Sequence, residues 1–263
     1  MRRLASFALY TVFLQVGFLI IQLWMGTHPS GQSIICKTYN MDAELCNKTL
    51  ADVLREFPEY VGNVNVVKRF GNDLPFLFKI LSVREPLSIQ SHPDKALAEK
   101  LHQEFPEKYP DSNHKPEMAI AISDFTALCS FRKHNEIIEN LDLHPELELV
   151  IGSDNTNNYK NASDKQKALK DCFEALMKSS DDKVCSVISA ISEKFEKSRT
   201  ESTIRKAFKK LIAYYPNDVG CLCLFFLNYL ELKPGEALYL AANEPHCYIS
   251  GGESLALMNK TTN

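Results

Sequence analysis

Two side chains that can bind a metal ion stand close together in the sequence Gln90-Ser91-His92, just before Pro93. Residues two apart on a strand project from the same face, so Gln90 and His92 would point together while Ser91 turns away. An amide oxygen beside an imidazole makes half of a divalent-metal site. An apolar strand that ends in Gln and His before a proline is, however, more commonly an ordinary strand end. Spacing alone therefore leaves the metal interpretation undecided.

Four blocks of sequence around this pair carry a family resemblance. They are Leu-Trp-Met-Gly-Thr-His-Pro-Ser-Gly at 23–31, the apolar block 74–95, His-Lys-Pro-Glu-Met-Ala-Ile-Ala at 114–121, and Leu-Lys-Pro-Gly-Glu at 232–236 leading to Asn-Glu-Pro-His at 243–246. In their residues and in their order along the chain, they closely resemble the motifs of the zinc-dependent type I mannose-6-phosphate isomerases (phosphomannose isomerases). The resemblance runs from residue 23 to about residue 251.

Carried over residue by residue, the resemblance implies one zinc ion per chain, bound by Gln90, His92, Glu117 and His246. Two neutral imidazoles, one carboxylate and one amide oxygen suit a borderline cation such as zinc. Taken singly, Glu117 would more commonly be an ordinary strand carboxylate and His246 a turn histidine. The histidines without comparable context are interpreted as surface or turn residues: His28, His102, His114, His134 and His144.

The resemblance also implies a set of substrate-binding side chains. Lys79 and Lys115 match family lysines that face the active site. Lys79 is the only charge in the apolar segment 76–83, and a buried lysine needs a partner. A phosphate or sugar hydroxyl would supply one, and so would a neighbouring carboxylate. Two further residues, each two positions from an expected ligand, complete the set: Tyr248 and Ser88.

The reaction that the resemblance implies is the reversible isomerisation of mannose 6-phosphate and fructose 6-phosphate, which supplies mannose precursors for glycosylation. A base would move a proton between C1 and C2 while zinc and cationic side chains hold the oxygens. The base is not identified, because the family's Arg-Ala-Gly-Leu-Thr-Pro-Lys-like run has no counterpart here, nor has its second cupin domain. We therefore expect a form altered at both ends and impaired in activity. The alternative is a non-catalytic, zinc-binding remnant.

Composition sets the remaining limits on function. The 263 residues are 45% hydrophobic and 24% charged, as in an ordinary globular protein of one or two domains. The net charge is −3 and no basic run is interleaved with aromatics, which argues against nucleic acid as a partner. We expect a monomer with a sugar phosphate substrate. Eight scattered cysteines without a CxxC motif favour a reducing, cytoplasmic compartment.

The start of the chain points the other way. Arg2 and Arg3 precede a run at 4–26 without a charged residue, which is long enough for a transmembrane or signal-anchor helix. Because this run stands where the family has strands, we expect an apolar helix poorly integrated with the sheets, from an alternative exon or a mis-called start. A genuine anchor, giving a membrane-bound or secreted protein through residues 1–26, is the alternative.

Hydrophobic periodicity indicates strands on both sides of a helical region. Strands are expected at 76–83, between Pro86 and Pro93, at 117–122 and at 220–230, with a short helix opened by Asp94. Three helical stripes between about 135 and 215 predict a small bundle, with polar connections at 152–163 and 179–183. Lone strands are unstable, so the outer strands must rejoin across the helices. The resemblance implies an α+β fold, an incomplete cupin-type jelly roll with an inserted helical domain.

The expected domain organisation follows from this order. It comprises an N-terminal apolar segment outside the core at 1–22, the first cupin part at 23–131, the helical insertion at 132–219, returning strands at 220–252 and a divergent tail at 253–263.

Overall fold

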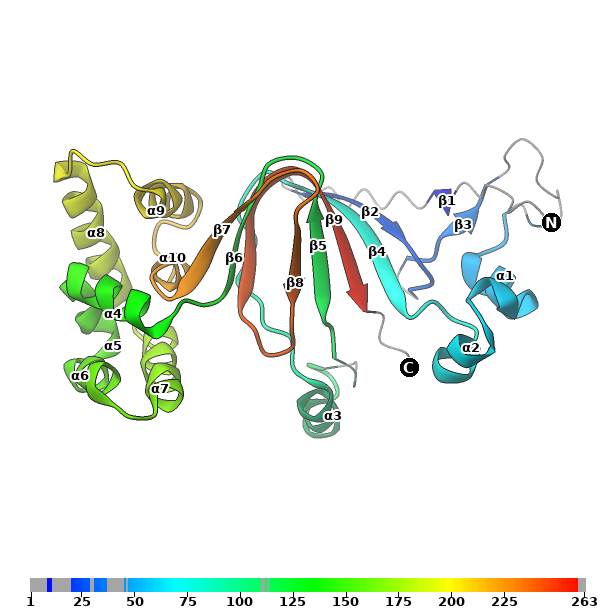
Figure 1. The fold of residues 1–263 in the computed structure, drawn as a ribbon, viewed down its shortest axis with the longest axis horizontal. Coiled ribbons are helices and arrows are strands. Elements are labelled where there is room, and N and C mark those ends of the chain that lie inside the picture. Colours follow the sequence, from blue (N-terminus) through cyan, green and yellow to red (C-terminus); the bar gives the residue numbers. More distant parts are fainter. Residues whose placement is uncertain are drawn as a thin grey trace.

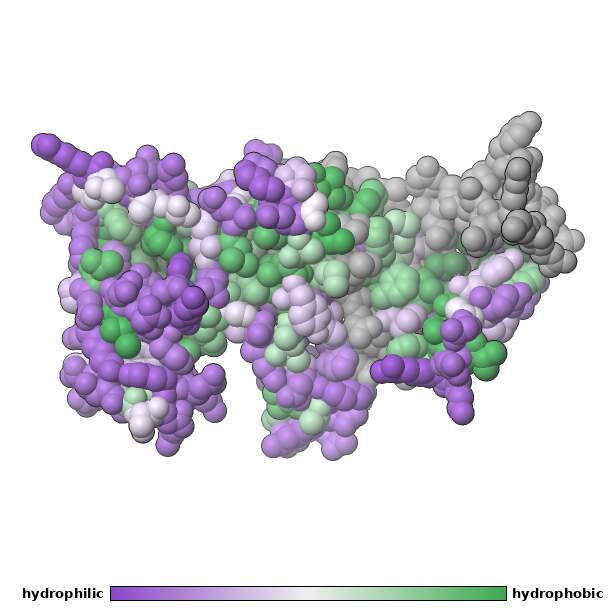
Figure 2. Space-filling model, viewed as in Figure 1, coloured by the Kyte–Doolittle hydropathy of each residue, from purple (hydrophilic) through white to green (hydrophobic). Residues whose placement is uncertain are grey.

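The computed structural model describes residues 9–10, 20–28, 31–36, 45, 47–109, 112 and 114–259, with only the backbone at 9–10, 20–22 and 252–259. A strongly curved antiparallel sheet forms the middle of the molecule (Figure 1). A helical unit lies on one side of the sheet, short helices lie on the other, and α3 (Lys95–Glu104) lies below it. Hydrophilic residues cover the outer helices, while hydrophobic residues gather over the sheet (Figure 2).

Within the described ranges, seven strands form the main sheet. Its continuous path runs through β2 (Ile20–Met25), β4 (Phe76–Val83), β9 (His246–Asn259), β5 (Glu117–Ala121) and β8 (Ala237–Leu240). β6 (Phe125–Phe131) pairs with both β9 and β7 (Leu227–Leu232). A separate two-stranded pairing joins β1 (Leu9–Tyr10) to β3 (Ile34–Ile35). Strands from before and after the helical unit therefore share one sheet, as predicted.

The long strand β9 connects the two parts of this sheet. Its first half pairs with β6, and its second half lies between β4 and β5. The change of partner occurs at Gly251, which is in register with both Phe125 and Val83. A Cβ at Gly251 would lie 2.2 Å from Cδ2 of Phe125, so no larger residue fits here without displacing that ring. A glycine at this point allows β9 to pass from one set of partners to the other.

The helical unit contains its own hydrophobic core. Its elements are α4 (His134–Leu143), the 3₁₀ helix η3 (Pro145–Leu147), α5 (Glu148–Ile151), α6 (Ser153–Asn161), α7 (Lys165–Met177), α8 (Asp181–Lys197), α9 (Thr203–Tyr214) and α10 (Gly220–Cys223). The predicted apolar stripes are the buried faces of α7, α8 and α9, where Leu176, Ile191 and Phe208 are fully buried. Burying such side chains stabilises the unit by about 1.5–3 kcal/mol each.

Two expectations about this region are wrong. The stretch 152–163 is not a polar connection but contains α6, whose Tyr159 is buried and hydrogen-bonds its hydroxyl to Nδ1 of His134 at 2.8 Å. The segment 220–230 is not one strand, because it begins with α10 and becomes β7 only at Leu227. All side chains from Cys221 to Leu227 are buried, and a fully buried run has no periodicity that separates helix from strand.

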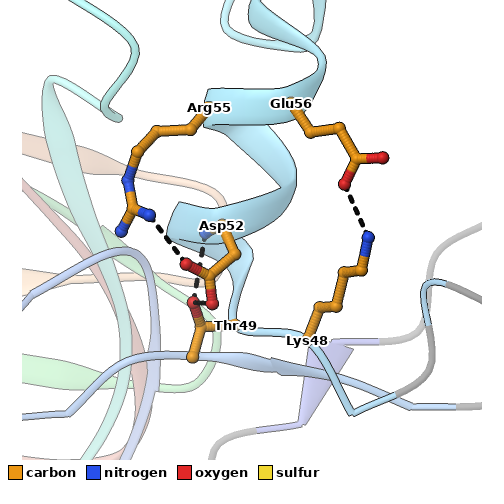
Figure 3. Close-up of polar contacts among 5 residues, drawn as sticks. All are labelled: Lys48, Thr49, Asp52, Arg55 and Glu56. Atoms are coloured by element: carbon orange, nitrogen blue, oxygen red, sulfur yellow. Dashed lines mark hydrogen bonds and ion pairs between the residues drawn. The ribbon is translucent and has the colours of Figure 1, made fainter.

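On the other side of the sheet lie α1 (Leu50–Glu56), the 3₁₀ helix η2 (Pro58–Tyr60) and α2 (Val64–Phe70). Figure 3 shows how α1 begins: the Thr49 hydroxyl oxygen accepts a hydrogen bond from the Asp52 amide at 3.1 Å. Arg55 then pairs with the Asp52 carboxylate at 2.8 Å, and Lys48 pairs with Glu56 at 2.6 Å. An N-cap of this kind contributes about 1 kcal/mol to helix stability.

The predicted N-terminal helix is wrong wherever the structure describes that part of the chain. Residues 9–10 and 20–25 are strands, and β2 is in register with β4 from Ile20 opposite Val83 to Met25 opposite Phe78. Residues 20–22 therefore belong to the sheet, whereas 1–8 and 11–19 lie outside the described residues. Among the helices that are described, none has the length and apolar character needed to cross a membrane.

Candidate metal centre

Three side chains from separate parts of the chain meet inside the curved sheet. Glu117 opens β5, which forms at the strand expected at 117–122, and alternation there buries Glu117 and Ala119 and leaves Met118 exposed. His246 opens β9, and His92 lies just before α3. Each of the three offers one ligand atom, and these atoms all lie within 4.8 Å of one another. The structure thus brings together three of the four predicted zinc ligands.

The carboxylate of Glu117 lies between the two imidazoles. Its Oε1 is 3.1 Å from Nε2 of His92, and its Oε2 is 3.8 Å from Nε2 of His246. Glu117 and His246 are each only 4% exposed, and His92 is half-buried. Buried charge requires compensation, so a carboxylate in this position needs a cation or hydrogen-bond donors.

The orientation of His246 leaves one ring nitrogen open to a metal. Its Nδ1 donates to the main-chain oxygen of Glu244 at 2.9 Å, so Nε2 carries the lone pair. That Nε2 is buried and has no hydrogen-bond partner among the described residues. Metal-binding histidines characteristically donate their other nitrogen to a carbonyl in this way. The orphaned Nε2, the carboxylate and the second imidazole therefore fit a cation that prefers nitrogen and oxygen ligands.

Tyr248 holds the second oxygen of the carboxylate. Its hydroxyl donates to Oε2 of Glu117 at 3.0 Å, and both groups are buried. Burial, followed by the charge of Glu117, raises the pKa of Tyr248, so the phenol keeps its proton. Burial on its own would raise the pKa of Glu117, but hydrogen bonds from His92 and Tyr248 and the proximity of His246 lower it below its ordinary value. The site therefore holds an ionised carboxylate ready to bind a cation.

Gln90 stands directly opposite His246. The two residues exchange both main-chain hydrogen bonds, each at 2.8 Å. Residues paired in this way project from the same face, so the Gln90 side chain lies on the metal side of the sheet, where it is exposed. This contact is an isolated bridge, so the continuous strand expected between Pro86 and Pro93 is wrong. Binding of metal by Gln90 stays a prediction.

The turn at Asn243 and the segment from His92 to Asp94 are hydrogen-bonded to each other beside the site, although neither Asn243 nor Asp94 was assigned to it from the sequence. The Asn243 amide donates to the carbonyl of His92 at 2.7 Å, and the Asn243 side chain hydrogen-bonds the Asp94 carboxylate at 2.9 Å. Asn243 has φ of 64°, a conformation that Asn tolerates better than most residues. The Asn in the Asn-Glu-Pro-His motif was the available signal, since turns select Asn for this backbone geometry.

The predicted lysines lie beside the centre. Lys79 is in register with residue 256 of β9, which is in register with Ala119, so Lys79 shares the inner face with Glu117. Its ammonium lies 4.4 Å from the centroid of the Trp24 ring. Burial lowers the pKa of Lys79, the charge of Glu117 acts to raise it, and the charge of Lys115 lowers it further. Ser88 is exposed and lines a separate cavity described below.

One of the other histidines is not the surface or turn residue that was predicted. His144 is only 7% exposed, with its ring centroid 4.7 Å from that of Phe225 and 5.5 Å from that of Phe195. Burial, followed by the charge of Lys194, lowers its pKa below the ordinary 6.5. His144 belongs to the packing of the helical unit rather than to the metal centre.

The comparisons with known proteins agree with this geometry. Residues 20–134 match the family "Phosphomannose isomerase type I, catalytic domain", and residues 148–227 match "Phosphomannose isomerase type I, helical insertion domain". Mannose-6-phosphate isomerase of Mus musculus is 44% identical over 240 residues, which are 88% of this chain and 55% of that protein. Mannose-6-phosphate isomerase 1 of Arabidopsis thaliana is 42% identical, covering 92% of this chain and 56% of that protein. The chain thus spans about half the length of these relatives.

Solved structures give the same result. A phosphomannose isomerase variant from Salmonella typhimurium is similar with a TM-score of 0.78 and 27% identity, over 92% of this chain and 60% of that one. A zinc-bound mannose 6-phosphate isomerase has a TM-score of 0.76 and 28% identity, with the same coverage. These neighbours have the cupin fold, which confirms the predicted α+β class with a helical insertion. The chain therefore belongs to the type I phosphomannose isomerase family.

Proposed function

We propose that this protein is a zinc-dependent aldose–ketose isomerase that interconverts mannose 6-phosphate and fructose 6-phosphate. The observation that carries the proposal is the buried Glu117 carboxylate between His92 and His246, with Nε2 of His246 left without a hydrogen-bond partner in the described part of the chain. Family membership and the names of the relatives support the substrate. A zinc-bound relative of the same fold supports the metal.

Each side chain of the centre would have a distinct role. Zinc bound by His92, Glu117 and His246, with Gln90 as the fourth ligand, would supply a Lewis acid for a sugar oxygen. Tyr248 would keep Oε2 of Glu117 in place. Lys79, on the same inner face, would pair its ammonium with the substrate's phosphate or a hydroxyl, assisted by Lys115. The proton-transferring base is not assigned.

A second candidate is a zinc-binding protein without turnover. It rests on one feature of the site, since the three converging side chains account for metal binding while no proton-transferring base is assigned. The three converging ligands would still bind the metal, so binding and turnover must be measured separately.

The experiment compares zinc content and isomerase activity in the same samples. Purified protein is stripped with a chelator and reloaded with zinc, and activity is followed in a coupled assay with mannose 6-phosphate. His246→Ala removes a ligand, and His102→Ala is the matched control because His102 lies on α3 outside the cluster. Loss of zinc and of turnover only in His246→Ala supports the isomerase. One zinc per chain without turnover supports the second candidate, and no zinc binding in the unaltered chain refutes both.

A further inference from the structure

The strand β9, which carries the expected ligand His246, has a second face. His246 and Tyr248 project toward Glu117, and Tyr248 packs in the hydrophobic cluster inside the sheet. Cys247, between them, packs instead in the cluster of the helical unit, as does Ile249. Across the bridge to Gln90, the neighbouring Ile89 also packs against the helical unit. Segments 87–90 and 246–249 therefore form a ribbon with the candidate metal centre on one side and the helices on the other.

A cavity of about 270 Å³ lies on the helical side of this ribbon. Ile89 and Cys247 form its wall on the ribbon, and Leu211 of α9 and Cys221 of α10 form the opposite wall. The lining is mainly apolar. A cavity of roughly 150 Å³ is enough to hold a benzene molecule, so this one has room for a bicyclic ring.

The charged group that lines this cavity is negative. Asp218 is the only charged side chain among the described residues that line it, and Oδ1 of Asp218 accepts a hydrogen bond from the Gly220 amide at 2.6 Å. The Tyr215 hydroxyl donates to the carbonyl of Pro86 at 2.6 Å, which leaves its aromatic ring as the surface offered to the cavity. An apolar cavity with one carboxylate and one aromatic ring is complementary to a ligand that joins an apolar group to a positive charge.

We propose that this cavity binds a small aryl or alkyl ammonium compound, with its apolar part against Ile89 and Leu211 and its ammonium at Asp218. Binding is coupled to the metal centre, because Ile89 and Cys247 are the immediate chain neighbours of Gln90 and His246. A ligand that shifts the ribbon also shifts the ring of His246. The binding site itself rests on the cavity alone, while the coupling rests on the metal of the proposed function.

The test uses the full chain and two probes of similar shape and opposite charge. In tryptamine a short chain on the indole ring ends in an ammonium group, and in indole-3-propionate a short chain at the same ring position ends in a carboxylate. Calorimetry is expected to show one tryptamine bound per chain and at least roughly fivefold weaker binding of the carboxylate. Equal affinity for the two probes, or no saturable tryptamine binding, overturns the proposal.

Matched variants locate the site. Asp218→Asn keeps an oxygen for the Gly220 amide but removes the charge, and it is expected to weaken tryptamine binding roughly fivefold. Asp181→Asn is the control, since Asp181 lines a neighbouring depression and not this cavity. Val219→Phe places a ring at the cavity wall and should also block binding. Unchanged affinity in both Asp218→Asn and Val219→Phe would place tryptamine elsewhere and refute this site.

The coupling is measured as the change in zinc affinity when tryptamine is saturating. By linkage, tryptamine must change zinc affinity by the same factor as zinc changes tryptamine affinity, and we expect a factor of at least roughly five. An unchanged zinc affinity refutes the coupling. A chain that binds tryptamine but no zinc would refute the proposed metal function and leave the cavity site intact, so the two failures are distinguishable.

Discussion

Replacing Tyr248 by Phe removes one hydroxyl that the metal centre uses to hold its carboxylate. That hydroxyl lies 3.0 Å from Oε2 of Glu117, and the nearest ring nitrogen of His246 is 3.8 Å from the same oxygen. A hydrogen bond to a charged group contributes about 1.5–3 kcal/mol, and both groups here are buried. Loss of a group that orients a metal ligand typically lowers metal affinity about 10–100-fold. We expect Tyr248→Phe to bind zinc within that range of weakening.

The pH dependence of this variant adds an independent check. Tyr248 is one of the groups that lower the pKa of Glu117, so that pKa should rise when the hydroxyl is removed. Protons compete with zinc for the carboxylate, so the variant's zinc affinity should begin to fall at a higher pH than in the unaltered protein. Competition with a zinc chelator between pH 5 and pH 8 measures both effects, and Tyr239→Phe, at an exposed position on β8, is the control. Zinc affinity of Tyr248→Phe within about twofold of the control, in a normally folded sample, would refute the role given to this hydroxyl.

Three further predictions concern stability. The pKa of His144 is lowered in the folded state, so its contribution to stability is complete above pH 6.5 and is lost as the pH falls toward the folded pKa. Thermal melts of His144→Phe should therefore lose less stability between pH 7.5 and pH 5.5 than melts of the unaltered protein. A melt of His144→Phe with the unaltered pH slope would contradict this. Gly251→Ala should melt at a lower temperature, because its methyl group would lie 2.2 Å from Cδ2 of Phe125, and Phe125→Leu should relieve part of that cost in the double variant. In urea unfolding, Leu176→Ala should lower the free energy of unfolding by about 2–5 kcal/mol, whereas Met177→Ala, at the exposed neighbouring position, should lower it by less than about 1 kcal/mol. Equal losses in the two variants would mean that Leu176 is not a core residue.

Local signals in the sequence predicted the parts of the site that local geometry determines. The strand expected at 117–122 forms as β5, and its alternation buries Glu117 while it exposes Met118. Asp94 caps α3 by accepting a hydrogen bond from the Leu97 amide at 2.8 Å, as a residue opening a helix should. These features depend on residues only a few positions apart.

The errors arose where distant partners decide the outcome. A charge-free run at 4–26 fits an apolar helix by composition, but residues 20–25 find hydrogen-bonding partners in β4, more than 50 positions later. His144 caps the end of α4 between the exposed Leu143 and Pro145, and it is covered by Phe195 and Phe225 from later parts of the chain. Periodicity records the pattern of one segment and not the identity of the segment that packs on it.

The helical insertion is therefore part of what positions the metal centre. Alternate residues of β9 divide between the two environments, with His246 and Tyr248 toward Glu117 and Cys247 toward the helices. The Cys247 thiol donates to the carbonyl of Leu87 at 2.9 Å, and this contact reinforces the pairing that places Gln90 opposite His246. Packing of the helices against this face limits how far the ribbon can move, because close-packed side chains resist displacement. The backbone that carries His246 is thus packed, through Cys247, against the helical core.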